Sequence, residues 1–406
     1  MSTPTPVQPT ATENDVVIVA CSRTPMGAFQ GQFTQMTAPE LGAAAIRASL
    51  ERSGLAADAV DASFMGCVLS AGLGQAPARQ AALLAGLPQQ VNCTTINKIC
   101  GSGLQSVILA HDMLKAGTHE TMVAGGMESM SNAPYLLDKA RAGYRMGHGE
   151  ILDHMMLDGL QDAYQNEPTP MGVFAEATAK KYGFTREQQD EFAIESLRRA
   201  NAAIESGAFD NQITPVIVKT RKGETEYRVD EQPGKARPEK IPSLRPAFVK
   251  DGTVTAANSS SISDGAAAIL ITTRAKAEAL GCNIIATIKG HATYSREPEW
   301  FTLAPVGAMQ KLMDKLNWAV DSTDLFEINE AFAVVTMAAM HDLGIPHDKV
   351  NIHGGACALG HPIGASGARI LVTLLAALQE KRLKTGIASL CIGGGEAVAM
   401  AVELAE

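Results

Sequence analysis

The chain has 406 residues, of which 46% are hydrophobic and 19% are charged. This length and composition are typical of a compact enzyme with two or three domains and a large buried core. The formal net charge of −9 and the lack of any basic run argue against a nucleic-acid partner, and no apolar run reaches the ~18 residues that a membrane-spanning helix needs.

The first 14 residues are polar, rich in Pro and Thr, and contain neither Arg nor Lys. We therefore expect a disordered tail over residues 1–14 rather than a signal or transit peptide. The seven cysteines are scattered, with no CxxC pair and no metal-ligand spacing. This pattern predicts free thiols in a reducing compartment, no bound metal and a cytoplasmic location.

The first third of the chain alternates short apolar runs with stretches of helical periodicity, which predicts a layered α/β fold. We expect a turn at "CSRTPMG" after the first strand, and Gly125-Gly126 to end the third. Strands are expected at 16–20, 91–96 and 122–124, and helices at 41–50, 76–85 and from about 104 to 114, with Leu104, Val107, Ile108 and Leu114 on one face.

The middle of the chain, residues 131–262, differs in character from both ends. It holds a charged helical stretch, a polar hairpin-like stretch and a Pro-rich connection, and so predicts an insertion packed on a core. The last third repeats the first in outline: Ser-Gly, an apolar helix, a strand and a glycine pair, over 103–125 and again over 367–393. We therefore expect two similar halves, formed by 15–130 with 263–284 and by 285–406.

Cys100 lies directly before a Gly-Ser-Gly turn, between the strand at 91–96 and the helix that follows. A free cysteine is usually a small buried hydrophobe. A helix start also presents free N–H groups and partial positive charge, which stabilise a thiolate. Position alone leaves both interpretations of Cys100 open.

The second half of the chain adds two candidate groups. Cys391 ends a strand in "LCIGGGEA" and meets three glycines, whose N–H groups can bind an oxyanion. His361 lies between Gly360 and Pro362 in a glycine-rich loop, as either a functional group or a satisfied structural one. A cysteine with a histidine forms a nucleophile pair, and a second cysteine supplies a separate acid or base.

Asn329 and Glu330 lie in "EINEAFA", a polar interruption of an apolar pattern. They are either a helix N-cap with a first-turn acid, or site residues that point inward. Without further evidence the sequence favours the cap.

Five stretches carry a resemblance to a known family: "NKICGSGLQS", "GGMESMSNAPY", "NEAFA", "GHPIGASGAR" and "CIGGG". In this order and spacing, from residue 16 to near the C-terminus, the chain resembles the thiolases, and most closely their acetyl-CoA C-acetyltransferase branch. The resemblance implies a duplicated five-layered αβαβα core, with residues 131–262 as a loop domain that binds coenzyme A and carries a tetramerisation loop. It also implies a homotetramer built from dimers.

The resemblance assigns a role to each candidate. Cys100 would take an acetyl group from the first acetyl-CoA, and His361 would accept its thiol proton. Cys391 would remove the α-proton of the second acetyl-CoA, and Asn329 would position a water that stabilises the enolate. The backbone N–H groups of Cys100 and Gly393 would hold the acyl oxygen.

The substrates implied are acetyl-CoA, acetoacetyl-CoA and coenzyme A, with no cofactor and no metal. Ser260 matches a serine that contacts the pantetheine arm. Met171, Phe248, Phe301 and Phe332 match positions around the pantetheine and acyl group.

Two departures from the branch pattern affect substrate range. Pro170 stands where many acetoacetyl-CoA thiolases have a histidine, and Phe301 stands where the bacterial biosynthetic enzymes often have a methionine. These departures leave open a broader 3-ketoacyl-CoA thiolase that acts on branched or longer chains.

Two other interpretations of the function are less consistent with the sequence. A decarboxylating ketosynthase typically has a histidine or asparagine at the position of Cys391. A thiolase-like binding protein that has lost its chemistry would lack a catalytic group.

Overall fold

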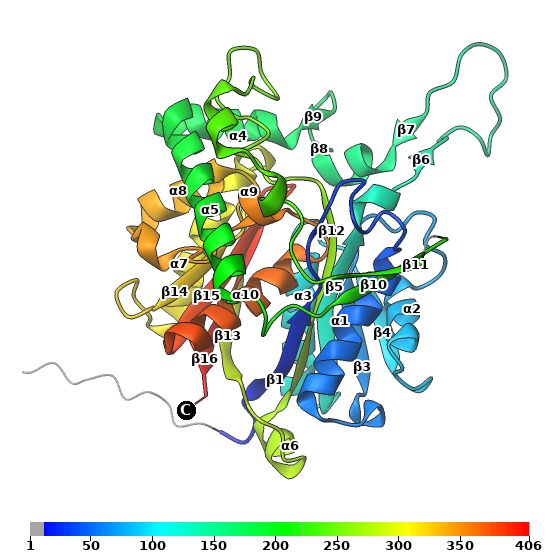
Figure 1. Ribbon diagram of the computed structural model, residues 1–406, viewed down its shortest axis with the longest axis vertical. Coiled ribbons are helices and arrows are strands. Elements are labelled where there is room, and N and C mark those ends of the chain that lie inside the picture. The colour runs from blue at the N-terminus through cyan, green and yellow to red at the C-terminus, as the bar shows by residue number, and fades with distance from the viewer. Residues whose placement is uncertain (1–11, 222, 406) are drawn as a thin grey trace, which may run out of the picture.

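The computed structural model describes residues 12–221 and 223–405. Within these residues ten strands form one mixed sheet, in the order β14-β15-β16-β13-β1-β12-β5-β3-β4, with β2 paired to β12 (Figure 1). The strands are β1 (Val16–Arg23), β2 (Gly27–Ala28), β3 (Ala62–Gly66), β4 (Asn92–Ile96), β5 (Thr121–Ser129), β12 (Ser263–Thr273), β13 (Ala286–Ser295), β14 (Leu325–Ile328), β15 (Thr385–Ile392) and β16 (Glu396–Leu404).

The two ends of this sheet repeat one pairing pattern. In the first half β1 pairs antiparallel with β12, β12 antiparallel with β5, and β5 parallel with β3. In the second half β13, β16, β15 and β14 follow the same sequence of antiparallel, antiparallel and parallel pairs. A short antiparallel contact between β1 and β13 joins the halves, at Val17 with Thr287 and Ile18 with Ala286.

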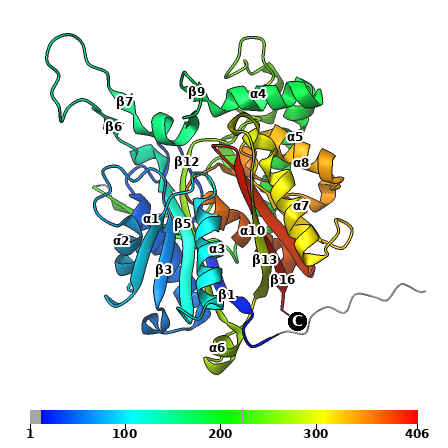
Figure 2. The same ribbon diagram turned by 180° about the vertical axis from the view of Figure 1, so that it is seen from behind.

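Helices cover both faces of each half-sheet and give five layers (Figures 1 and 2). One apolar cluster combines α3 and α10 with strands of both halves, so these two helices form the central layer. Separate clusters hold α1 and α2 on the outer face of the first half and α7 on that of the second. The helices are α1 (Ala38–Ser53), α2 (Pro77–Leu84), α3 (Ser102–Lys115), α7 (Ala304–Leu316), α8 (Ala333–Leu343) and α10 (Ser366–Lys381).

The remaining elements lie mostly between β5 and β12. Helix α5 begins with a capping box of Thr185 and Gln188, and the left-handed Gly207 caps its C-terminal end. These elements are β6 (Tyr135–Leu136), β7 (Leu152–Asp153), β8 (Gln161–Asp162), β9 (Thr169–Pro170), α4 (Met171–Tyr182), α5 (Arg186–Ser206), β10 (Val216–Thr220) and β11 (Gly223–Tyr227), with α6 (Arg274–Ala279) and α9 (Ala356–Leu359) elsewhere in the chain.

Two local predictions are wrong. Strand β1 extends three residues into the expected turn, as far as Arg23, and β5 runs through Gly125 and Gly126 to Ser129. A Cβ at Gly126 would overlap the carbonyl oxygen of Gly364, and one at Gly125 would overlap β12. The two glycines therefore allow close approach of neighbouring backbone and do not end the strand.

Most of the tail expected at residues 1–14 lies outside the described residues. Within them, the carbonyl oxygen of Glu13 accepts a hydrogen bond from Ala275 N at 3.0 Å, and that of Asn14 accepts one from Lys115 Nζ at 2.7 Å. In the described part of the chain, no helix is both long and apolar enough to cross a membrane.

Candidate active site

Cys100 is presented by a tight bend between β4 and α3. Ile99 has a left-handed φ of 45°, which is unfavourable for a β-branched residue. Ser102 Oγ holds the bend by accepting from Lys98 N at 2.8 Å and donating to the carbonyl oxygen of Ile99 at 2.7 Å. Local strain is thus stored beside the thiol that the sequence singled out.

Burial raises the pKa of the Cys100 thiol to about 11, and hydrogen bonds from the backbone N–H groups of Gly393 and of Cys100 itself lower it only in part. The helix start therefore does not bring the pKa of this thiol below its ordinary value. The same two N–H groups converge on the sulfur, so the Gly393 position predicted from sequence lies at the reactive atom.

His361 is fixed as one tautomer by the first turn of α10. Its Nδ1 is hydrogen-bonded to Ser366 Oγ, and the Ser366 hydroxyl donates its single hydrogen to the carbonyl oxygen of Pro362 at 2.9 Å. We therefore assign the imidazole hydrogen to Nδ1, which leaves Nε2 with a free lone pair. Nε2 is buried and has no hydrogen-bond partner in the described structure.

Burial, followed by the charge of Arg369, lowers the pKa of His361 to about 3. The imidazole is therefore neutral at physiological pH. A neutral ring with a free Nε2 lone pair can accept a proton from a thiol.

Glu128 was not identified from the sequence, although it lies in the quoted "GGMES" stretch. Its buried carboxylate accepts hydrogen bonds from Val68 N at 3.0 Å, Leu69 N at 3.1 Å and Gly364 N at 2.8 Å. Burial raises its pKa to about 7, against these hydrogen bonds. The side chain thus fixes the loop of His361 to β5 of the first half. An acid inside an otherwise apolar strand was the available signal.

Cys391 lies near the end of β15 and is fully buried. It packs in the apolar cluster that contains Phe301 and Phe332. Burial and then the neighbouring Cys100 raise its pKa well above the ordinary value. The structure therefore brings both predicted cysteines to one site, each as a thiol in its resting form.

Asn329 does not cap a helix. It follows β14, whereas α8 begins at Ala333 after Phe332 as N-cap. Its Oδ1 accepts from Arg369 Nη2 at 3.4 Å, while its buried Nδ2 has no partner in the described structure. A buried amide donor without a partner is available to a water or a substrate oxygen.

Glu330 also points inward and has a structural role. Its carboxylate accepts from Ser196 Oγ at 2.7 Å, Asn351 Nδ2 at 2.9 Å and Cys357 N at 3.0 Å. These bonds fix the loop that carries Asn329 to α5, to α9 and to the segment before α9.

A cavity of about 400 Å³ lies at Cys100, and its lining is mostly apolar. Two edge-to-face ring pairs form part of the wall, Phe248 with Phe332 at 5.9 Å and Phe301 with Phe332 at 6.5 Å. All five predicted contact residues line it, together with Pro170, His361 and Gly393: Met171, Phe248, Ser260, Phe301 and Phe332. Such a pocket suits an acyl group and an uncharged chain.

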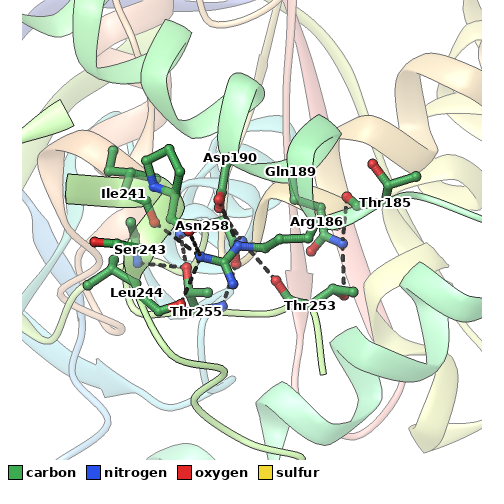
Figure 3. Close-up of polar contacts among 12 residues, drawn as sticks. Thr185, Arg186, Gln189, Asp190, Ile241, Ser243, Leu244, Thr253, Thr255 and Asn258 are labelled. Atoms are coloured by element: carbon green, nitrogen blue, oxygen red, sulfur yellow. Dashed lines mark hydrogen bonds and ion pairs between the residues drawn. The ribbon is translucent and has the colours of Figure 1, made fainter. Parts of the chain in front are cut away.

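A polar network holds the segment that carries Phe248 (Figure 3). Arg186 Nη2 donates to the carbonyl oxygens of Ile241 at 3.0 Å and Leu244 at 2.9 Å, and its Nε donates to Asp190 Oδ2 at 2.7 Å. Asp190 Oδ1 accepts from Asn258 Nδ2 at 3.0 Å. Helix α5 thus fixes both ends of the 244–258 segment beside the cavity.

Comparisons with known proteins show the family of the chain. Residues 16–275 match the model of the thiolase N-terminal domain, and residues 282–404 match that of the thiolase C-terminal domain. An acetyl-CoA acetyltransferase of Pseudomonas aeruginosa is 50% identical over 95% of this chain and 98% of its own length, and one of Escherichia coli is 50% identical over 95% and 98%.

Two solved structures show the same fold. The acetyl-CoA acetyltransferase of Bacillus anthracis is 40% identical, with a TM-score of 0.94 over 96% of this chain and 99% of that one. The Acat5 thiolase of Ascaris suum, solved in complex with coenzyme A, is 40% identical, with a TM-score of 0.91 over 96% of this chain and 100% of that one.

Proposed function

Because the chain belongs to the thiolase family, we propose that it catalyses the reversible Claisen condensation of two acetyl-CoA molecules to acetoacetyl-CoA and coenzyme A. The observation that carries this proposal is the convergence of Cys100, His361 and Gly393 on one apolar cavity, with Cys391 in its wall cluster. Relatives named acetyl-CoA acetyltransferases at about half identity support acetyl-CoA as the substrate.

In the first half-reaction the Cys100 sulfur attacks the thioester carbonyl carbon of acetyl-CoA. Because the resting thiol has a raised pKa, its proton passes to His361 Nε2 as the bond forms. The N–H groups of Cys100 and Gly393 stabilise the carbonyl oxygen as it gains charge. The Cys391 thiol protonates the departing coenzyme A thiolate, which leaves acetyl-Cys100, a Cys391 thiolate and a protonated His361.

In the second half-reaction the Cys391 thiolate removes an α-proton from the second acetyl-CoA and becomes a thiol again. The enolate oxygen receives a hydrogen bond from Asn329 Nδ2, directly or through a water. The enolate carbon attacks acetyl-Cys100, acetoacetyl-CoA forms, and the Cys100 thiolate regains its proton from His361. The first half-reaction exchanges one thioester for another, and in the second the C–S bond of acetyl-Cys100 breaks as the new carbon–carbon bond forms, so the bonds balance without a redox or phosphoryl cofactor.

For the thioester substrates, we assign the pantetheine arm to the wall formed by Met171, Phe248, Ser260 and Phe332. Residues 131–262 would then form the loop domain that binds coenzyme A. The coenzyme A complex of the Ascaris suum thiolase supports this assignment.

We further propose a cytoplasmic homotetramer. Exposed apolar side chains around β6 and β7 support an assembly contact there: Tyr135, Leu137, Met146 and Ile151 are 68%, 53%, 100% and 67% exposed. Sedimentation of the purified chain tests this assembly.

Pro170 and Phe301 both line the cavity, so acyl range is part of the proposal. Turnover of acetoacetyl-CoA, 2-methylacetoacetyl-CoA and 3-ketohexanoyl-CoA with coenzyme A separates the two substrate ranges. The proposal expects acetoacetyl-CoA to be the best substrate, and faster turnover of the longer or branched substrates would favour the broader 3-ketoacyl-CoA thiolase.

The proposed chemistry is tested by the loss of acetoacetyl-CoA in the presence of coenzyme A, for the wild type and for Cys391→Ala. We expect rapid thiolysis in the wild type and loss of it in the variant. Full activity of the variant would refute the role of Cys391.

A further inference from the structure

Two histidines and an aspartate meet away from the cavity, where the two halves of the fold join. His111 and Asp112 lie in α3 of the first half, and His291 lies in β13 of the second (Figure 2). His111 Nδ1 is 2.9 Å and His291 Nε2 is 2.8 Å from the same oxygen of Asp112. The three ligand-capable atoms all lie within 4.8 Å of one another.

The cluster has the composition of a transition-metal site. Two imidazoles with one carboxylate, plus water, form a common ligand set for zinc and for related divalent ions. Among the described residues, no other group of three His, Cys, Asp or Glu side chains has this geometry. The cluster is therefore singled out by ligand type and by convergence together.

Two buried imidazoles beside one exposed carboxylate suit a metal site that is open to water. The imidazoles of His111 and His291 are only 10% and 16% exposed and pack edge to face at 5.1 Å. They stand on a helix and a strand, which limit their motion. The Asp112 side chain is 55% exposed, so it can rotate and leave a position for water.

The cations around the cluster are directed elsewhere. Lys115 Nζ donates to the carbonyl oxygen of Asn14 at 2.7 Å and pairs with Asp15 at 3.7 Å. Lys315 Nζ donates to the carbonyl oxygen of His291 at 3.4 Å. Neither lysine is paired with Asp112.

We propose that His111, Asp112 and His291 bind one divalent transition-metal ion, with zinc as the representative, and that the ion joins α3 of the first half to β13 of the second. On binding, each coordinating nitrogen presents its lone pair and its hydrogen moves to the other ring nitrogen. Ligands of a tetrahedral zinc lie about 3.4 Å apart, given zinc–nitrogen bonds of about 2.0–2.1 Å. Rotation of Asp112 and a modest approach of the imidazoles meet this spacing. The site does not depend on the proposed catalytic function.

The test compares zinc binding by the wild type and by His291→Ala. Accessible thiols are first alkylated with iodoacetamide in every sample, so that Cys100 does not bind the metal. The protein is dialysed against zinc chloride, and bound zinc is measured by elemental analysis. We expect one more zinc per chain in the wild type than in the variant, and a rise in the melting temperature with zinc in the wild type only.

His341→Ala is the matched control. His341 Nδ1 lies 3.0 Å from Asp342 Oδ1, so it reproduces the adjacent His-Asp pair without a second histidine. Asp112→Asn, at an exposed side chain, carries the test if His291→Ala does not fold. Equal zinc in the wild type and the cluster variants, or an equal loss in His341→Ala, would overturn the proposal.

Discussion

Replacing Ser366 by alanine tests how His361 is held as a base. The hydroxyl of Ser366 is the hydrogen-bond partner of His361 Nδ1, and the imidazole is only 6% exposed. In Ser366→Ala the Nδ1 hydrogen loses that partner in a buried place. The tautomer that carries its hydrogen on Nε2 then becomes competitive, and it cannot accept the Cys100 proton.

The expected size follows from the lost hydrogen bond. Leaving a buried donor unpaired costs about 1–3 kcal/mol. If that cost appears in the population of the competent tautomer, the acylation rate falls by about 5–150-fold. We therefore expect kcat/KM for acetyl transfer to fall within this range in Ser366→Ala, while Ser366→Thr, which keeps the hydroxyl, stays within a few-fold of the wild type.

The assay follows acylation of Cys100 by rapid mixing with acetyl-CoA. The matched control is Ser106→Ala, because the buried Ser106 hydroxyl donates to the carbonyl oxygens of Gly103 at 2.7 Å and Gly125 at 2.6 Å and serves no imidazole. The reasoning fails if folded Ser366→Ala acylates at the wild-type rate. It also fails if Ser106→Ala slows acylation equally.

Three further predictions concern the same region. Because burial raises the pKa of Cys100 to about 11, the rate at which iodoacetamide alkylates it in the free enzyme should keep rising from about pH 7 to about pH 10. A rate that is already constant above about pH 7 would instead indicate an ion pair with His361. Arg186→Ala leaves Asp190, only 6% exposed, without its cation, so the free energy of unfolding should fall by about 3 kcal/mol, and KM for coenzyme A should rise more than kcat falls. An unchanged KM in Arg186→Ala would show that the Arg186 network does not position Phe248. Gly126→Ala places a Cβ against the carbonyl oxygen of Gly364. The free energy of unfolding, measured with denaturant, should therefore fall by about 1–3 kcal/mol. Wild-type stability of the variant would contradict the close approach of the two backbones.

Local pattern was sufficient for many elements of the fold. Apolar runs and helical periodicity predicted β1, α1 and α3, and the repeat of Ser-Gly with a later glycine pair predicted two similar halves. The pattern failed at Gly125 and Gly126. A glycine pair in a sequence usually indicates the end of a strand. Here the lack of a Cβ at Gly126 lets the backbone of Gly364 approach closely, and Gly364 is 238 positions further along the chain.

Some site residues could be identified from local sequence pattern, and others only from the fold. Cys100, His361 and Cys391 have glycine-rich neighbours in the sequence, so local sequence pattern was sufficient to identify them as candidates. Ser366 and Glu128 act by hydrogen bonds to partners that only the fold brings near. Sequence reading alone favoured Asn329 as a helix cap, and the inward position appears only when β14 and α8 are both located.

The proposed metal cluster illustrates the limit of spacing rules. His291 is 179 positions from Asp112, so no ligand motif of fixed spacing includes both. Only the pairing of the two half-sheets brings α3 and β13 together. The cluster therefore exists only in the folded chain and has no counterpart in the sequence pattern.

The central claim is that Cys100 carries the acetyl group and that the condensation step needs Cys391 as its base. The most direct measurement is peptide mass spectrometry of protein quenched in acid after incubation with acetyl-CoA. We expect one acetyl group on the peptide that contains Cys100, in the wild type and in Cys391→Ala, with acetoacetyl-CoA formed only by the wild type. An acetyl group on another residue, or acetoacetyl-CoA formed without Cys391, would contradict the account.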